Sequence, residues 1–178
     1  ALAASDEITI AIHGKQTHGA WPEMGVDPIV VASHVVLALQ NIPAREIDAR
    51  ETIVLTFGKI EAGNRYNIIP GEARLEGTLR THDGKVQEQA HRRIREITEK
   101  TAEAFGAKAE VEIRRYTPVT WNDPALTERM IPTLKRVLGD AQVRIGQQTT
   151  TAEDFSYFQQ KAPGLFFIRA SLALKTAR

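Results

Sequence analysis

Residues 72–81 read Glu72-Ala73-Arg74-Leu75-Glu76-Gly77-Thr78-Leu79-Arg80-Thr81. Small or apolar residues alternate with charged or polar residues along this run. A period of two is typical of a β-strand with one buried face, because successive side chains of a strand point to opposite faces of the sheet. We therefore predict a strand over 72–81. Its expected inward residues are Ala73, Leu75, Gly77 and Leu79, and its expected outward residues are Arg74, Glu76, Thr78 and Arg80.

A long helix and a further strand are predicted after this run. Asp83-Gly84 ends the strand, and apolar residues at helical spacing follow over 85–105, with charged residues between them. Gly106 is a typical helix stop. Residues 109–114 alternate again and predict another strand. The helix has one narrow apolar stripe, so it should cover a sheet on one side and face water on the other.

Three elements are predicted before the run. Residues 7–12 alternate isoleucine with Thr9 and Ala11, and residues 52–60 are rich in β-branched and aromatic side chains, so both stretches predict strands. Between them, Asp27-Pro28 can cap and begin a helix, which predicts a helix over 28–40. The order is therefore βαββαβ. It is typical of an α+β fold in which a four-stranded antiparallel sheet carries both helices on one face, as in ferredoxin-like domains.

The predicted helix from Pro28 to Gln40 is apolar around most of its circumference. A helix of this kind needs burial on two sides. One side can lie on the sheet, and a second subunit is the simplest cover for the other. We therefore expect a homodimer through this helix, with an edge of the sheet as a further contact. Val31 and Val35 are the candidate outward residues.

The composition changes after Tyr116. Asn122-Asp123-Pro124 is predicted to start a helix that runs to about Leu138 and is ended by Gly139. A short strand is predicted over 142–145 and a short helix over 153–158. Residues 165–168 form a continuous apolar run, which is typical of a strand buried on both faces. Such a strand needs neighbours, and this region supplies almost none. We therefore expect an incomplete α/β segment here.

The bulk properties exclude several classes of function. The chain has 178 residues, 42% hydrophobic and 25% charged, as in folded globular proteins. A net charge of +1 gives no electrostatic basis for binding nucleic acid or an anionic membrane, and no apolar run approaches the roughly 20 residues that cross a bilayer. The lack of cysteine excludes thiol nucleophiles and cysteine-ligated zinc. RNA-binding domains share the βαββαβ order, but they need aromatic residues where residues 72–81 present Arg, Glu and Thr, so we reject RNA binding.

One histidine lies on a stiff loop between the first strand and the first helix. The loop reads Gly14-Lys15-Gln16-Thr17-His18-Gly19-Ala20-Trp21-Pro22. Glycine permits unusual dihedrals and proline fixes one, and rigid loops often display functional side chains. By itself, however, this loop favours a surface or packing role for His18. A metal site is not expected among the other histidines, because they show neither i,i+4 spacing nor a shared loop; they are His13, His34, His82 and His91.

Four motifs, taken together, resemble those of a known enzyme family. They are His18-Gly19-Ala20 with Pro22 and Asp27-Pro28-Ile29; Gly63-Asn64 through Asn67-Ile68-Ile69-Pro70; Gly77-Thr78-Leu79-Arg80; and Glu153-Asp154-Phe155-Ser156. In this order and spacing, the chain resembles the metal-dependent amidohydrolases of the aminoacylase and carboxypeptidase G family. Within that family it is most similar to the branch of hippurate hydrolases and auxin-conjugate amidohydrolases. The resemblance covers the chain up to about Ile168.

The resemblance implies a division of the chain. Residues 1–116 correspond to a lid or dimerisation domain, and residues 117–178 to a C-terminal part of a zinc-peptidase-like catalytic domain. The full-length enzymes hold two divalent metal ions, zinc, through ligands that match no position in this chain, and residues 170–178 depart from the family pattern. We therefore expect a portion of an enzyme, or a degenerate copy of one, that holds no metal and is inactive alone.

The resemblance also implies roles for individual residues. His18 would reach across the dimer and hydrogen-bond the scissile carbonyl oxygen of a small-molecule amide in the partner's active site. Asn67 would help to bind the substrate, and Arg80 would pair with its carboxylate. Glu153 and Asp154 would line the active-site floor. Without the family, Asn67 would be interpreted as a turn residue, Arg80 as an exposed strand residue, and the two acids as charges favoured at a helix N-terminus.

The expected function is therefore a portion of a metal-dependent amidohydrolase that hydrolyses N-acyl amino acids or related amides. The alternative is a non-catalytic dimerisation module, or a regulatory module that binds a small molecule, because βαββαβ sheets serve many unrelated roles.

Overall fold

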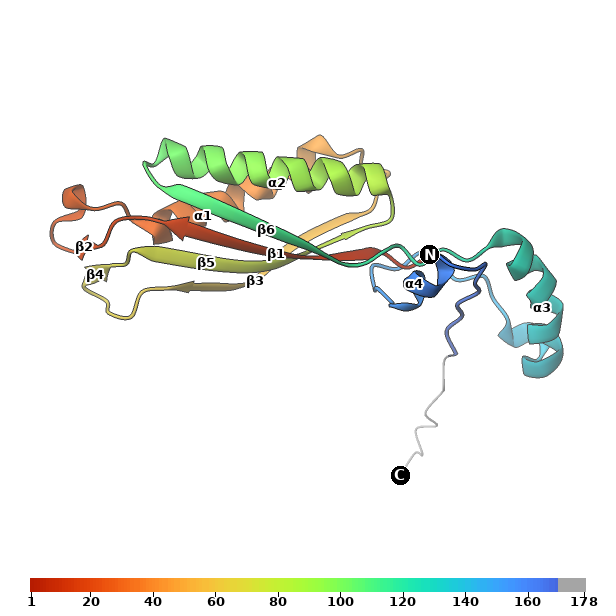
Figure 1. Cartoon of the computed structure of the whole chain (residues 1–178). Coiled ribbons are helices and arrows are strands. Elements are labelled where there is room, and N and C mark those ends of the chain that lie inside the picture. The colour runs from red at the N-terminus through yellow and green to blue at the C-terminus, as the bar shows by residue number, and fades with distance from the viewer. Residues whose placement is uncertain (170–178) are drawn as a thin grey trace, which may run out of the picture.

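The computed structural model describes residues 1–169 and contains one principal sheet with two long helices on it (Figure 1). Four strands make this sheet: β1 (Ala4–His13), β3 (Ile53–Ala62), β5 (Glu72–Thr81) and β6 (Lys108–Thr117). Helix α1 (Pro28–Leu39) follows β1, and helix α2 (Gly84–Ala104) follows β5. The predicted βαββαβ order is confirmed, and the predicted bounds of β5 are those of the structure.

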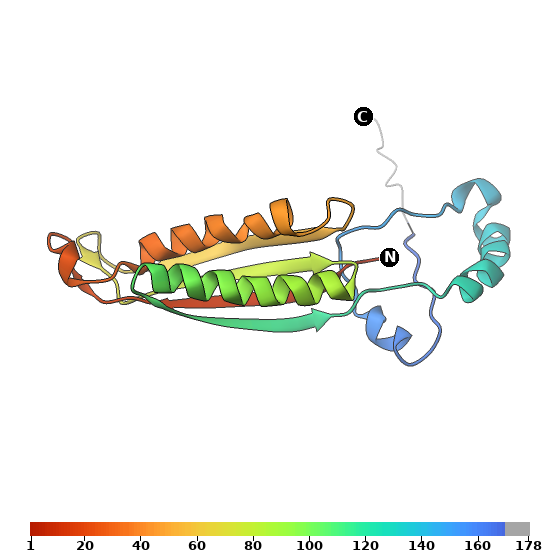
Figure 2. The ribbon, with the colours of Figure 1, turned by 90° about the horizontal axis from the view of Figure 1, so that it is seen from above.

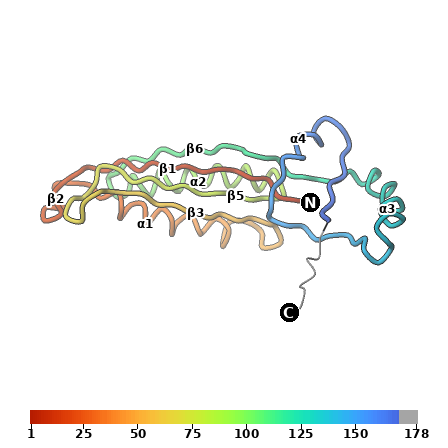
Figure 3. Tube along the Cα trace, turned by 90° about the horizontal axis from the view of Figure 1, so that it is seen from below, coloured from red at the N-terminus to blue at the C-terminus, as the bar shows by residue number. Residues whose placement is uncertain are grey.

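The sheet is antiparallel throughout, in the order β3-β5-β1-β6. Seen from above, α1 and α2 lie side by side over one face (Figure 2), and seen from below the other face is open (Figure 3). The predicted α+β fold, with both helices on one face, is therefore confirmed. In this order β3 and β6 are the edge strands.

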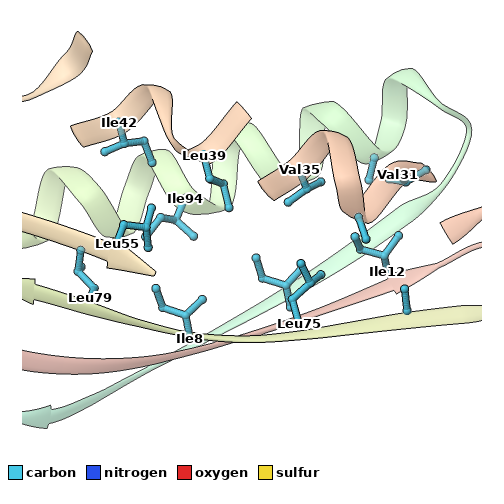
Figure 4. Close-up of a cluster of buried hydrophobic side chains, with 14 of the residues drawn as sticks. Ile8, Ile12, Val31, Val35, Leu39, Ile42, Leu55, Leu75, Leu79 and Ile94 are labelled. Atoms are coloured by element: carbon cyan, nitrogen blue, oxygen red, sulfur yellow. The ribbon is translucent and has the colours of Figure 1, made fainter. Parts of the chain in front are cut away.

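The core lies between the sheet and the two helices (Figure 4). Alternate residues of β1 and β5 supply much of it, as the alternation predicted: Ile8, Ile10 and Ile12 from β1, and Ala73, Leu75 and Leu79 from β5. Gly77 has a steric reason to be glycine, because an added Cβ would lie 2.8 Å from Phe57 Cδ1 and 2.7 Å from the carbonyl oxygen of Thr56. Side chains that are fully buried in the core include Ile8, Ile10, Ile12, Leu39, Leu75, Leu79 and Ile94.

Helix α1 begins as the sequence predicted, but its outward face is different. The Asp27 side chain accepts a hydrogen bond from the backbone N–H of Ile29 at 2.9 Å, which caps the helix. The expectation that Val31 and Val35 face outward is wrong: they are 1% and 0% exposed. They are four residues apart, so they share one helix face, and that face lies on the core. The exposed apolar residues of α1 are Ile29, Val30 and Leu37.

Helix α2 is tied to the short helical turn that follows α1. The Asp83 side chain caps α2 by accepting hydrogen bonds from the backbone N–H groups of Lys85 and Val86, at 2.7 and 3.1 Å. Further along, Arg93 donates two hydrogen bonds to the Glu46 carboxylate, at 2.6 and 3.0 Å. This bidentate pair lowers the pKa of Glu46 and raises the pKa of Arg93.

After β6 the chain forms helix α3 (Pro124–Leu138) and the short helix α4 (Phe155–Gln159). Both helices were predicted, but the strands predicted over 142–145 and 165–168 are absent from the part of the chain that the structure describes. Residues 165–168 have no neighbouring strand to bond with. Instead, the side-chain amide of Asn122 makes two 2.8 Å hydrogen bonds with the backbone of Phe166, one as donor and one as acceptor. Ile145 is 91% exposed, so the shorter run has nothing to pack against.

Backbone hydrogen bonds join this C-terminal segment to the start of β1. Leu2 and Thr120 exchange two bonds, at 3.0 and 3.1 Å, and the N–H of Ala3 donates to the carbonyl oxygen of Thr151 at 2.8 Å. The ring of His82, just past β5, lies 2.8 Å from the carbonyl oxygen of Thr149 through Nε2. Across residues 1–169, no helix combines the length and the apolar character needed to cross a membrane.

Candidate functional site

Strand β2 (Thr17–His18) lies at the end of the molecule that is farthest from the C-terminal segment (Figure 1). His18 belongs to this two-residue strand, which pairs antiparallel with β4 (Ile68–Ile69). The N–H of Gly19 donates to the carbonyl oxygen of Asn67 at 2.9 Å, which continues this ladder. An added Cβ on Gly19 would lie 3.1 Å from that oxygen, so a small residue suits the position. The structure therefore brings His18, in β2, next to Asn67, the turn residue that precedes β4, and both are exposed.

The ring of His18 has a defined hydrogen-bonding state. Its Nδ1 accepts a hydrogen bond from the backbone N–H of Ala20 at 3.1 Å. In the neutral ring one nitrogen accepts and the other carries the proton, so this contact places the proton on Nε2. His18 is thus suited to donate a hydrogen bond from Nε2 to an external acceptor.

The turn that carries His18 is held by several further bonds. The N–H of Trp21 donates to the carbonyl oxygen of His18 at 2.9 Å, and Thr17 Oγ1 donates to the carbonyl oxygen of Trp21 at 3.3 Å. Lys15 and Val26 exchange two backbone hydrogen bonds across the base of the loop, at 2.9 and 3.0 Å. The expected stiff loop is therefore a closed, hydrogen-bonded turn.

A cavity of about 420 Å³ borders this turn. It lies between Gly19, the start of α1 and the connection from β3 to β4. The lining mixes backbone with charged, polar and apolar side chains, so it is not a purely apolar pocket. Its lining residues include Asp27, Ile29, Asn64, Arg65, Tyr66 and Ile68.

Arg80 lies near the opposite end of the sheet from His18. Gly71, next to the start of β5, accepts a hydrogen bond from the N–H of Gly14 at 2.8 Å, so this end of β5 adjoins the His18 loop. Arg80 is eight positions further along β5 than Glu72, or about 27 Å at the usual rise of an antiparallel strand. Its half-buried guanidinium donates to Thr78 Oγ1 and, at 3.2 Å, to the carbonyl oxygen of Leu79.

Glu153 and Asp154 lie at the Arg80 end, where residues 149–151 bond to the start of β1. Both are exposed and directly precede α4. The Asp154 side chain makes no capping hydrogen bond to that helix. The Glu153 backbone carbonyl accepts hydrogen bonds from Ser156 Oγ at 2.9 Å and Thr120 Oγ1 at 3.3 Å. Within one chain, then, His18 and Asn67 form one group, and Arg80, Glu153 and Asp154 lie far from it.

Two features of the site were missed in the sequence. One is the β2–β4 ladder, for which the adjacent β-branched residues Ile68-Ile69 were the available signal. The other is the exposed Trp21 ring, whose centroid lies 5.7 Å from that of His18. No group of three or more side chains suited to hold a metal ion occurs among residues 1–169.

Comparisons with known proteins place this geometry in a family. The chain is 36% identical over 165 residues to N-acetyl-L-cysteine deacetylase of Bacillus subtilis. This alignment covers 93% of this chain and 39% of that protein. The chain is 34% identical over 167 residues to thermostable carboxypeptidase 2 of Saccharolobus solfataricus, covering 93% and 42%. A solved dinuclear metal binding peptidase of the M20 family, from Bacillus subtilis, superposes with a TM-score of 0.72 at 28% identity, covering 92% of this chain and 39% of that one.

The chain thus spans about two fifths of the length of the curated relatives that it matches. The family model for the peptidase dimerisation domain matches residues 3–105, which is more than half of the chain and contains all of β1 to α2. The chain therefore belongs to the peptidase dimerisation domain family of the M20 peptidases.

Proposed function

We propose that this chain is part of a metal-dependent amidohydrolase that acts on N-acyl amino acids or related amides, in the manner of hippurate and auxin-conjugate hydrolases. Residues 1–116 would be its lid and residues 117–178 a portion of its catalytic domain; residues 170–178 lie outside the described residues. The relatives support the reaction class, since deacetylases and carboxypeptidases both hydrolyse amide bonds. The four-stranded sheet with its two helices would serve as the lid.

The observation that carries the proposal is the placement of the His18 Nε2–H donor. It lies on a rigid, exposed turn that adjoins the Glu72 end of β5, whereas Arg80 is about 27 Å further along that strand from Glu72. One small amide cannot touch both groups in a single chain. We therefore assign His18 and Asn67 to the active site of a neighbouring subunit, where His18 would stabilise the developing oxyanion and Asn67 would help to bind the substrate. Arg80 would bind the substrate carboxylate, and Glu153 and Asp154 would line the floor, in the site of their own subunit.

A homodimer would bring such groups together, and α1 offers a surface for it. Val30 and Leu37 are seven residues apart on this helix and so share a face, and they are 45% and 72% exposed. Strand β3, which α1 adjoins, is an edge of the sheet and could pair with its copy in the partner. Both features support a two-fold contact through α1 and β3.

The two metal ions of such an enzyme, which activate water in this reaction class, find no suitable ligand set among residues 1–169. We derive no step through them. The ligands, and the glutamate base, would come from other parts of the full-length enzyme. Isolated, this chain should neither hydrolyse amides nor hold stoichiometric zinc.

The trans role can be tested with mixed dimers of the full-length enzyme. His18→Ala should lower kcat by roughly 10²–10³-fold, as for the loss of one oxyanion donor, and change the free energy of unfolding by no more than about 0.5 kcal/mol because the side chain is exposed. Mixing it with a metal-ligand variant should restore activity, since some dimers then hold one intact site. Glu23→Ala, exposed on the same turn, is the matched control and should stay active.

Mixtures that exchange subunits but remain inactive would contradict the trans role. A full-length protein that hydrolyses no amide, yet dimerises, would instead favour the alternative of a non-catalytic dimerisation or small-molecule-binding module.

A further inference from the structure

A large aromatic side chain lies exposed beside His18. The ring of Trp21 is 60% exposed, its centroid is 5.7 Å from that of the His18 ring, and the two planes are inclined by 50°. Met24, on the same turn, is 59% exposed. An indole ring buries a large apolar area when it packs against another surface, and that burial is strongly stabilising. An indole that stays exposed lacks this stabilisation. The tip of the lid therefore carries an apolar surface directly next to the proposed oxyanion donor.

Hydrogen bonds to the backbone hold Trp21 and His18 in one turn. The N–H of Trp21 donates to the carbonyl oxygen of His18 at 2.9 Å, and the carbonyl oxygen of Trp21 accepts from Met24 N–H at 3.2 Å and from Thr17 Oγ1 at 3.3 Å. Pro22 follows and fixes the next backbone dihedral. Any surface that receives the His18 ring therefore also receives the indole.

We propose that Trp21 determines substrate specificity: its indole forms one wall of the neighbouring subunit's site and contacts a ring-sized apolar group bonded to the scissile amide. This inference rests on the proposed function. When His18 Nε2 lies at hydrogen-bonding distance, about 3 Å, from the carbonyl oxygen, the groups attached to the carbonyl carbon lie only a few bonds further away. With ring centroids 5.7 Å apart, the indole is within van der Waals reach of such a group.

The chemistry of the turn favours an apolar substituent. Trp21 and Met24 are the large apolar side chains exposed on it, and Glu23 is its exposed charged residue. The other charged and polar groups nearby, such as Asp27 and Arg65, line the neighbouring cavity. A flat aromatic face contacts another ring over a large area, and a methyl group over a small one. The loss on truncating Trp21 should therefore depend on the size of the substituent.

The test compares Trp21→Ala and Trp21→Phe with the parent in the full-length enzyme, using three substrates. N-acetylglycine has no ring, N-benzoylglycine has a ring on the acyl side, and N-acetylphenylalanine has a ring on the amine side. For Trp21→Ala we expect kcat/KM to fall by roughly 10–200-fold for a ring-bearing substrate, and by less than about 3-fold for N-acetylglycine. Trp21→Phe keeps an aromatic face and should recover most of the loss.

The outcomes separate the inference from the proposed function. If the parent hydrolyses none of the three amides, the proposed function is wrong and the role of Trp21 falls with it. If the parent is active but Trp21→Ala loses activity equally on all three substrates, Trp21 contacts protein rather than substrate, and only its specificity role is wrong. If Trp21→Ala leaves kcat/KM unchanged on every substrate, the specificity role of Trp21 is also wrong. Thermal unfolding and light scattering should show a folded dimer for each variant, because the side chain is exposed.

Discussion

Asp6 is a charged residue at a position where the pattern of β1 calls for an apolar one. It shares a strand face with Ile8, Ile10 and Ile12, and its side chain is 1% exposed. Two side chains of helix α2 supply hydrogen-bond partners for the Asp6 carboxylate. Gln87 Nε2 donates to both carboxylate oxygens, at 3.0 and 2.9 Å, and His91 Nε2 lies 2.6 Å from Oδ2. These buried hydrogen bonds connect α2 to β1 at the end of the sheet where the C-terminal segment begins.

We expect His91→Ala to destabilise the chain by about 1–3 kcal/mol, because it leaves a buried carboxylate short of one partner. Urea unfolding followed by circular dichroism measures the change. Arg92→Ala removes the neighbouring exposed side chain and is the matched control, with an expected change within about 0.5 kcal/mol. Equal losses for the two variants would mean that the Asp6–His91 contact contributes nothing to stability.

At the level of single residues, local sequence patterns predicted which side chains are buried. They did not predict which residues, far apart in the sequence, lie next to each other in the fold. The alternation in β5 identified Ala73, Leu75 and Leu79 as core residues because side-chain direction follows from strand geometry alone. No local pattern could reveal that Asn67 lies beside His18 or that His91 meets Asp6. Those contacts join residues about 50 and 85 positions apart, so they depend on how the whole chain folds.

At the level of elements, the strongest periodic segments were predicted correctly, and helix α3 (Pro124–Leu138) lies between the predicted start at Asn122-Asp123-Pro124 and the predicted stop at Gly139. Its start has a capping aspartate before a proline, and Gly139 follows its end, so the signals are local. The two strands predicted in the C-terminal segment failed for the opposite reason. A strand needs a partner for its backbone hydrogen bonds, and residues 142–145 and 165–168 find none among the residues described.

Helix α1 shows why an apolar composition alone does not locate an interface. Its hydrophobic residues divide into a buried face, which includes Val31 and Val35, and an exposed face, which includes Val30 and Leu37. The sequence revealed the excess of apolar residues but assigned the wrong valines to the outer face. On this second face His34 stacks on Phe105, with ring centroids 4.5 Å apart.

We expect Leu37→Glu to convert the proposed dimer into a folded monomer, because it places a charge within an apolar contact while leaving the core intact. Val35→Glu should instead unfold the chain, since it buries a carboxylate in the core. Ala104→Glu, exposed near the end of α2, is the matched control and should remain dimeric. Multi-angle light scattering with urea unfolding separates the three results. A Leu37→Glu variant that dimerises as tightly as the parent would place the interface elsewhere.

At the scale of the whole molecule, almost all of the burial belongs to the first two thirds of the chain. The core cluster lies entirely within residues 8–107. Within residues 118–169, by contrast, only Thr120 and Ser156 are buried, and helix α3 has no buried residue. The large exposed apolar side chains of residues 118–169 include Trp121, Val137, Ile145 and Phe158. The relatives are more than twice as long as this chain, which agrees with a C-terminal segment that needs further protein to pack against.

This asymmetry predicts how pieces of the chain behave. Residues 1–120 contain the complete core and the backbone bonds between Leu2 and Thr120, so they should fold alone. Their midpoint of thermal unfolding should lie within about 5 °C of that of the whole chain, which corresponds to a change of roughly 1 kcal/mol or less. A fragment of residues 118–178 should show no cooperative unfolding transition, because its described part, residues 118–169, buries too little apolar area to offset the entropy of ordering the backbone. Circular dichroism during a thermal scan distinguishes the two fragments. A 1–120 fragment that is unfolded at 25 °C, or a 118–178 fragment that unfolds cooperatively, would show that stability is shared across the boundary between the proposed lid and the proposed catalytic portion.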